Sequence, residues 1–258
     1  MRREGLLFSG HCLLDIIKTL KLNRNIIAVA GLTAVLQVAT AGNVTGKITL
    51  KGTPPPEAPI PQAKENADCG KLLKAIPTTQ HWVVSPKGEL ANVVVVIKGV
   101  AGAKSSGDST SPAMLDQVSC IYTPSILAVQ TGQKISVKNS DPVMHNVHTR
   151  PAVAGNDEMN KAQFANAADL IFTFTKPEDF LKFQCDVHPW MFAWVTVVDH
   201  PYFAVTDKDG NFTIKDVPPG KYKIMATHRK AAPKGSEMDI EVKADGGKAD
   251  FTLEVPAK

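Results

Sequence analysis

The stretch that decides the fold is FLKFQCDVHPWMFAWVTVVD, residues 180–199. Its first part, FLKFQC (180–185), places Phe183 and Cys185 on one side of an extended chain. Its last part, AWVTVVD (193–199), is rich in β-branched residues. Both parts therefore predict β-strands. The short loop between them, CDVHPWM (185–191), carries a thiol, an imidazole and a thioether at intervals of three residues.

Strand patterns continue on both sides of this stretch. They include VTGKITLKG (44–52), ANVVVVIKG (91–99), SILAVQ (125–130), QKISVKN (133–139) and IFTFTK (171–176). After residue 200, alternating runs are separated by turn-forming pairs such as Asp209-Gly210, which suits hairpins. Only residues 62–75 favour a helix, and a short one. The sequence therefore predicts an all-β protein built from two sandwiches.

The composition agrees with short strands joined by many turns, since Gly and Pro contribute 18 residues each. Residues 1–41 hold five of the 29 Lys and Arg residues but only two of the 25 Asp and Glu residues. The rest of the chain is therefore close to neutral. No basic stripe with interleaved aromatic residues stands out, so we expect no nucleic-acid partner.

The N-terminal residues 1–41 have the parts of an export signal. Three basic residues between positions 18 and 24 precede the uncharged run IIAVAGLTAVLQVATA (26–41), which ends in an A-x-A pattern. This order predicts a signal peptide that is cut after Ala41, and a periplasmic or secreted protein. The alternative is an uncleaved membrane anchor, for which the apolar run is slightly short.

The cysteine count fits export. Cys12 lies within the expected signal, which leaves Cys69, Cys120 and Cys185. Three cysteines in an exported protein suggest one disulfide and one thiol kept for another purpose. Because Cys185 lies in the unusual loop, we expect a Cys69–Cys120 disulfide. The alternative is that both are unpaired buried thiols.

A metal site would need a further ligand from another loop. The segment NSDPVMHNVHT (139–149) places His145 and His148 directly after a predicted strand. Loops at one end of a sandwich converge, so one of these imidazoles can join the CDVHPWM loop. Two imidazoles, a thiolate and a weak thioether form the donor set of a blue-copper electron-transfer site. Zinc suits this set less well, because it is bound by Cys, His and carboxylate ligands rather than by methionine.

The loop C-x-x-H-P-W-M resembles the copper loop of amicyanin, in the plastocyanin-like cupredoxin family, and His145-Asn146-Val147-His148 is similar to that family's H-N-V-H run. The resemblance covers about residues 115–199, although Met144 stands where the family usually has Pro. It implies one type 1 copper ion with the ligands His145, Cys185, His188 and Met191. It also implies that Asn146 ties the two ligand loops together, and Phe183 matches the family's aromatic residue two positions before the cysteine.

A second resemblance covers the C-terminal part of the chain. The segment TDKDGNFTIKDVPPGKYKI (206–224) is similar to carboxypeptidase regulatory-like (transthyretin-like) sandwiches, and 46–52 and 91–99 look like that family's first strands. We therefore interpret residues 43–111 and 200–258 as the two parts of one discontinuous sandwich. A Greek-key cupredoxin domain, residues 112–199, would be inserted between them. This layout resembles exported proteins described as methylamine-utilisation-like.

These resemblances imply an electron carrier rather than an enzyme. Its partner would be a cytochrome or a dehydrogenase-like redox protein, and Pro189, Trp190 and Phe192 are the candidate docking residues around His188. The same aromatic residues could instead belong to the core. Two other functions stay open: a cell-envelope or carbohydrate-binding sandwich with an accessory or vestigial copper site, and a copper chaperone. Association with the cell envelope is a further expectation.

Overall fold

The computed structural model describes residues 40–257. Apart from its last two residues, the expected signal peptide (1–41) lies outside this range, and so does the alternative membrane anchor. The first strand begins at Gly42, directly after the expected cleavage position. Among the described residues, no helix has the length and apolar character needed to cross a membrane.

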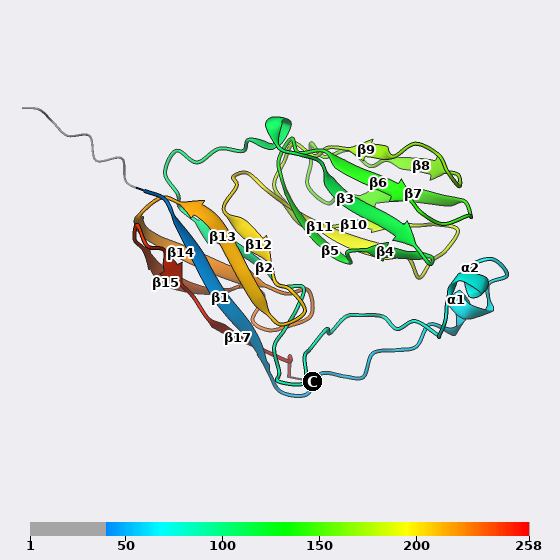
Figure 1. The fold of residues 1–258 in the computed structure, drawn as a ribbon, viewed down its shortest axis with the longest axis horizontal. Coiled ribbons are helices and arrows are strands. Elements are labelled where there is room, and N and C mark those ends of the chain that lie inside the picture. Colours follow the sequence, from blue (N-terminus) through cyan, green and yellow to red (C-terminus); the bar gives the residue numbers. More distant parts are fainter. Residues whose placement is uncertain (1–39, 258) are drawn as a thin grey trace, which may run out of the picture. The chain divides into compact units, whose positions relative to one another are not determined.

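The all-β prediction is confirmed: strands form nearly all of the regular structure in the described chain (Figure 1). The strands are β1 (Gly42–Lys51), β2 (Val94–Lys98), β3 (Ala113–Val118), β4 (Ile121–Thr123), β5 (Ile126–Gln130), β6 (Ile135–Asn139), β7 (His145–Arg150), β8 (Asn160–Gln163), β9 (Leu170–Phe172), β10 (Glu178–Gln184), β11 (Phe192–Val198), β12 (Phe203–Val205), β13 (Asn211–Val217), β14 (Gly220–Thr227), β15 (Ser236–Val242), β16 (Gly247–Lys248) and β17 (Phe251–Glu254). The helices are α1 (Pro61–Glu65), α2 (Cys69–Leu72) and the short 3₁₀ helix η1 (Gly107–Ser109).

One sandwich combines strands from the two ends of the described chain. In its first sheet β1 pairs with β13, β16 and β17, and its second sheet has the order β12-β2-β14-β15. Ile48, Val95, Ile97, Ile214 and Ile224 are fully buried in the core of this sandwich. The β-branched run predicted as a buried strand becomes β2, between β12 and β14. Strands from before residue 112 therefore pair with strands from after residue 200.

The second sandwich is formed by β3 to β11, within residues 113–198. One sheet has the order β5-β11-β10-β7-β8, and the other has the order β4-β3-β6-β9. The pairs β5–β11 and β3–β6 are parallel and the other neighbours are antiparallel. The core holds Phe172, Phe174 and Phe183, whose rings meet edge to face at centroid distances of 5.5 and 6.0 Å.

The segment with α1 and α2 departs from the expected domain division. From the sequence we expect all of residues 43–111 to belong to the discontinuous sandwich. In the structure, Cys69 is fully buried in the core of the second sandwich, and Leu72 packs against that core. The physical reason is a disulfide between Cys69 and Cys120, which lie 51 positions apart in the sequence. The segment is covalently tied to the sandwich that carries the CDVHPWM loop.

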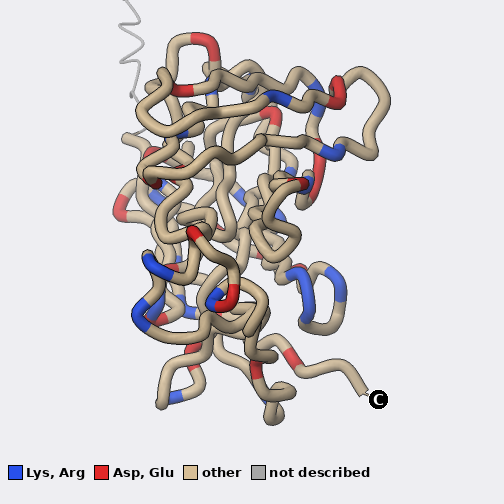
Figure 2. Tube along the Cα trace, turned by 90° about the vertical axis from the view of Figure 1, so that its right-hand side faces the viewer, with Lys and Arg blue, Asp and Glu red and all other residues tan. Residues whose placement is uncertain are grey.

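Charged residues of both signs are interspersed over the described chain (Figure 2). Several of them form exposed ion pairs across neighbouring strands, such as Lys51 with Glu254 and Lys223 with Asp239. Exposed pairs of this kind contribute little to stability, because water and salt screen the two charges. The hydrophobic cores and the sheet hydrogen bonds therefore provide most of the stability.

Candidate metal centre

His145 is the first residue of β7, and its side chain is fully buried. Its Nε2 atom lies 2.9 Å from a carboxylate oxygen of Asp141, four residues earlier, so the Nε2 proton can be donated to that oxygen. This leaves the Nδ1 atom as a lone-pair donor. Burial opposes the charged imidazolium, but the hydrogen bonds with Asp141 and Cys185 outweigh it and raise the pKa of His145 above its ordinary value.

The CDVHPWM loop connects β10 to β11 and closes on itself. The Cys185 amide donates to the Met191 carbonyl at 3.1 Å, and the Met191 amide donates to the His188 carbonyl at 2.8 Å. Cys185 and Met191 are 1% exposed and His188 is 7% exposed. A loop of seven residues with two internal hydrogen bonds therefore holds all three candidate ligands away from solvent.

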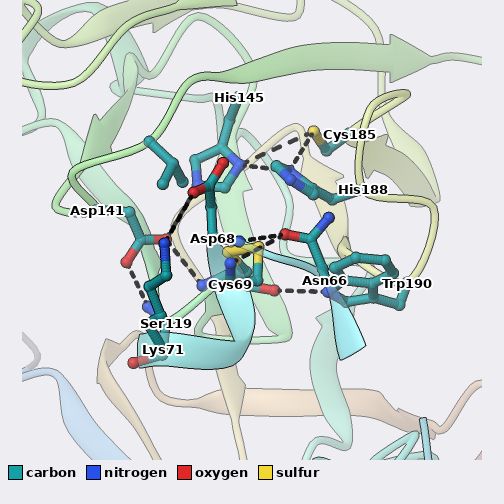
Figure 3. Close-up of a disulfide and its surroundings, with 12 residues drawn as sticks. Asn66, Asp68, Cys69, Lys71, Ser119, Asp141, His145, Cys185, His188 and Trp190 are labelled. Atoms are coloured by element: carbon teal, nitrogen blue, oxygen red, sulfur yellow. Dashed lines mark hydrogen bonds and ion pairs between the residues drawn. A yellow bond between two sulfur atoms is a disulfide. The ribbon is translucent and has the colours of Figure 1, made fainter. Parts of the chain in front are cut away.

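Three of the candidate ligand atoms lie close to one another. The Nδ1 atoms of His145 and His188 are 3.0 Å apart, and the Cys185 sulfur is 4.0 Å and 3.7 Å from them. A point equidistant from the three atoms lies about 2.1 Å from each, and bonds from a metal such as zinc to imidazole nitrogen and thiolate sulfur are about 2.0 to 2.3 Å. The triangle therefore has the size needed to hold one metal ion (Figure 3).

Asn146 joins the two ligand loops. Its side-chain oxygen accepts the Asp186 amide at 2.7 Å, and its side-chain amide donates to the Asp186 carboxylate at 3.0 Å. Its backbone amide points at the Cys185 sulfur at 3.5 Å. Burial disfavours the thiolate, but the hydrogen bonds from His145 and from backbone amides outweigh it and lower the pKa of Cys185. The thiol is thus poised to bind a metal as a thiolate.

The other predicted residues lie around this group. Phe183 lies two residues before Cys185. It is fully buried and packs against Phe172. His148 points away from the ligand triangle, because its two ring nitrogens contact Asp186 at 2.8 Å and Glu158 at 2.7 Å. Of the two histidines in the H-N-V-H run, only His145 therefore belongs to the ligand group.

The candidate docking residues differ in their surroundings. Pro189 is exposed, but Trp190 is half-buried and its indole N–H donates to the Cys120 carbonyl at 3.1 Å. Phe192 stacks on His81 with a centroid distance of 6.0 Å. Trp190 and Phe192 also line a cavity of about 310 Å³ together with Ile60 and Pro77. The docking role of these three residues stays a prediction.

The Cys69–Cys120 disulfide lies beside the ligand triangle, with one nitrogen of His188 within 4.8 Å of both sulfur atoms (Figure 3). The two cysteines are fully buried. Because their sulfurs are bonded to each other, they offer no thiolate to a metal. Among the described residues, Cys185 is the free cysteine. The group His145, Cys185 and His188 is therefore the one that can supply a thiolate ligand.

Asp141 contacts the candidate ligand His145, although we did not single it out from the sequence. One of its carboxylate oxygens contacts His145, and the two oxygens accept the amides of Ser119 and Cys120 at 2.6 and 2.8 Å. A carboxylate behind a metal-binding histidine fixes the ring and raises its basicity. The segment NSDPVMH (139–145) indicates this contact, because a tight loop joins its acidic residue to the histidine.

Comparisons with known proteins match separate parts of the chain. A family model for the second beta sandwich domain of BOS complex subunit NOMO1-like proteins matches residues 201–255. This match falls in the discontinuous sandwich, where the sequence analysis notes a carboxypeptidase regulatory-like pattern. No curated protein has significant similarity to the sequence.

Several solved structures are similar to part of the chain. An oxidised amicyanin variant is 22% identical with a TM-score of 0.30, and the match covers 40% of this chain and 97% of amicyanin. A purple cupredoxin from Nitrosopumilus maritimus is 21% identical with a TM-score of 0.28, over 33% and 98% of the two chains. The copper-containing nitrite reductase from Thermus scotoductus is 21% identical with a TM-score of 0.31; the match covers 34% of this chain and only 22% of the reductase.

The strand arrangement of residues 113–198 and the buried ligand group define a cupredoxin-like sandwich. A second β-sandwich accompanies it in the same chain. The comparisons do not establish membership of one particular family.

Proposed function

We propose that the protein binds one copper ion and carries single electrons between redox partners. The observation that supports this most is the buried triangle of His145, Cys185 and His188, whose facing atoms are spaced to hold one ion. When bound, copper supplies a one-electron couple between Cu(I) and Cu(II). The chain's own residues hold the ion, neutralise its charge and keep water away.

The donor set favours copper over zinc. Two imidazoles and a thiolate with the Met191 thioether as a fourth, weak ligand are the donors of a type 1 copper site. Catalytic zinc sites instead keep a position open for water. Met191 is 1% exposed and shares the core of the sandwich with Cys185. The enclosed site leaves no evident place for a substrate, which supports an electron carrier rather than an enzyme.

The surroundings of the ligands suit electron transfer. The disulfide, the Asn146 hydrogen bonds and the closed CDVHPWM loop all restrict movement of the ligand atoms. A site that keeps one geometry in both oxidation states loses little energy to rearrangement when an electron arrives. A copper chaperone has the opposite requirement, because it must hand over its ion. The burial of all four candidate ligands therefore favours a resident ion.

The remaining parts of the proposal are export, the partner and the role of the second sandwich. We place the protein in the periplasm or outside the cell, in line with the buried disulfide and the predicted signal. Its partner would be a cytochrome or a dehydrogenase-like redox protein. The discontinuous sandwich would act as a scaffold or as a docking module at the cell envelope.

A redox titration of the copper-loaded protein tests this function. An electron carrier should take up and release one electron per chain reversibly, with the copper still bound after repeated cycles. The His148→Gln variant is the matched control, since it removes a nearby imidazole outside the ligand triangle and should cycle in the same way. Loss of copper on reduction would instead identify a chaperone, and a protein that binds no copper would overturn the proposal.

A further inference from the structure

Residues 61–76, called the strap here, form a loop whose two ends are joined. The Ile60 amide donates to the Pro77 carbonyl at 2.8 Å, and the Thr79 amide donates to the Ala58 carbonyl at 3.0 Å. These bonds make a short antiparallel stem below the strap. Compact loops with paired ends are ordered by their own contacts and are frequently functional.

The strap is also locked from within. The Asn66 side-chain oxygen accepts the amides of Asp68 and Cys69 at 3.1 and 3.0 Å, which fixes the turn between α1 and α2. The Lys64 ammonium donates to the carbonyls of Gly70 and Leu73 at 2.8 and 2.6 Å. A Cβ atom at Gly70 would lie 2.1 Å from the Lys64 carbonyl oxygen, so the two helices approach each other closely. The strap can therefore hold a fixed shape.

The strap is fixed to the copper-binding sandwich at the edge of His188. Its Cys69 forms the disulfide with Cys120, and a nitrogen of His188 lies within 4.8 Å of both sulfurs. On the same side, the Trp190 ring lies 5.3 Å from the His188 ring. Only 7% of His188 remains exposed. The disulfide and the strap thus lie directly beside this ligand (Figure 3).

Cys120 connects the strap to both ligand loops. Its amide donates to Asp141 Oδ2 at 2.8 Å, and the same oxygen atom holds His145 at 2.9 Å. Its carbonyl accepts the Trp190 indole N–H at 3.1 Å. Ser119 and Cys120 have φ angles of 56° and 54°, a conformation that is unfavourable for residues other than glycine. Asp141 compensates for this by accepting both amides.

We propose that the strap is a disulfide-pinned cover that controls access to the copper site. Metal ions, chelators and small oxidants would reach the ligands only when the parts of the strap on either side of Cys69 move locally away from His188. The two sulfurs are fully buried, so the disulfide acts as a permanent fastener and not as an exchangeable switch. This inference rests on the proposed copper site for its biological meaning, but access to the ligand thiol can be measured without any metal.

The first experiment measures access to Cys185 in the metal-free full-length protein. Cys12 is replaced by serine in every variant, so that Cys185 is the free thiol, and iodoacetamide is the probe. The double variant Cys69→Ser with Cys120→Ser releases the strap. We expect alkylation to be at least about tenfold faster, because the strap can then open locally at a low cost in free energy. Gly70→Ala deforms the strap while keeping the disulfide, and it should accelerate alkylation in the same direction.

A matched control separates strap opening from general loss of stability. Ile214→Ala creates a cavity in the core of the other sandwich, far along the chain from the strap. It should lower the melting temperature without accelerating alkylation of Cys185. Equal alkylation rates in the unmodified strap, the double variant and Gly70→Ala would overturn the proposal. So would an acceleration by Ile214→Ala as large as that of the strap variants.

The second experiment measures copper exchange. We expect a chelator to remove copper at least about tenfold faster from the two strap variants, with the visible spectrum of the bound copper retained. Unchanged removal rates would contradict the cover. If no variant binds copper, the proposed function fails, and the alkylation rates still decide whether the strap covers the thiol.

Discussion

The Nδ1 atoms of His145 and His188 face each other at 3.0 Å, although the residues are 43 positions apart in the sequence. Two imidazole nitrogens at this distance need a shared proton or a shared cation between them. With the Cys185 sulfur at 3.7 and 4.0 Å, the arrangement suits a cation.

Asp141 should strengthen metal binding through His145. Asp141→Asn keeps the shape of the side chain and one acceptor oxygen, but it replaces the other acceptor by an NH2 group and removes the negative charge behind the imidazole. Loss of such a partner typically weakens metal affinity by about 10- to 100-fold. Competition with a copper chelator measures the change. Asp169→Asn is the control, because Asp169 contacts Ser136 and no ligand, and its affinity should match the parent's. An unaltered affinity in Asp141→Asn would argue against a supporting role.

Asn146 should stabilise the fold by joining the ligand loops. Asn146→Ala leaves the Asp186 amide without its acceptor and frees the end of β10. We expect the free energy of unfolding to fall by about 1–3 kcal/mol, measured by urea denaturation of the metal-free protein. Asn211→Ala, at the exposed first residue of β13, removes only exposed side-chain hydrogen bonds to Asp207 and should cost less. If both substitutions lowered the free energy of unfolding equally, Asn146 would have no special role.

His228 should make the stability of the discontinuous sandwich depend on pH. Its side chain is buried and accepts the Ala231 amide at 3.2 Å. Burial and the neighbouring Arg229 charge lower the pKa of His228 from 6.5 to about 4. Above pH 6.5 both the folded and unfolded states are neutral at this position. Between 6.5 and 4 the unfolded state binds the proton first, so stability falls as the pH falls, by up to about 1.4 kcal/mol per pH unit.

The His228→Asn variant tests this dependence. Asparagine keeps an acceptor near the same position but does not titrate. We expect urea denaturation between pH 7 and pH 4.5 to show a shallower loss of stability in the variant than in the parent. Parallel pH profiles for the two proteins would mean that His228 does not contribute.

Gly46 should be required for packing in the discontinuous sandwich and not for the copper site. A Cβ atom there would lie 1.8 Å from the Ala249 carbonyl oxygen and 2.6 Å from the Phe212 ring. Gly46→Ala should therefore reduce the free energy of unfolding by about 1–3 kcal/mol. The visible spectrum of bound copper should not change. A variant as stable as the parent, measured by thermal unfolding, would show that β1 has room to shift.

The sequence predicts much of the fold because alternating and β-branched runs mark the strands directly. The run at 91–99 becomes β2 at the centre of a sheet, and FLKFQC and AWVTVVD become β10 and β11 around the ligand loop. The spacing within CDVHPWM also fixes which groups one loop can present. By contrast, β8 lies in a segment, 151–163, that has no clear strand pattern. This segment forms a strand because it pairs with β7 in the folded protein, which the sequence does not indicate.

The strap and Asp141 show why part of the site is not readable from the sequence. Residues 53–62 look like a Pro-rich connection, and nothing local indicates that the following helices cover a ligand. Their position depends on the disulfide to Cys120 and on the stem at residues 58–60 and 77–79. Asp141 likewise gains its role from its contacts with His145 and the amide of Cys120.

The visible absorption spectrum of the copper-loaded protein tests the central claim most directly. If His145, Cys185 and His188 hold copper, the protein should show an intense charge-transfer band from thiolate to Cu(II). The band should disappear in Cys185→Ser and persist when Cys69 and Cys120 are both replaced by serine. A colourless protein after copper loading, or a band that survives in Cys185→Ser, would contradict the account.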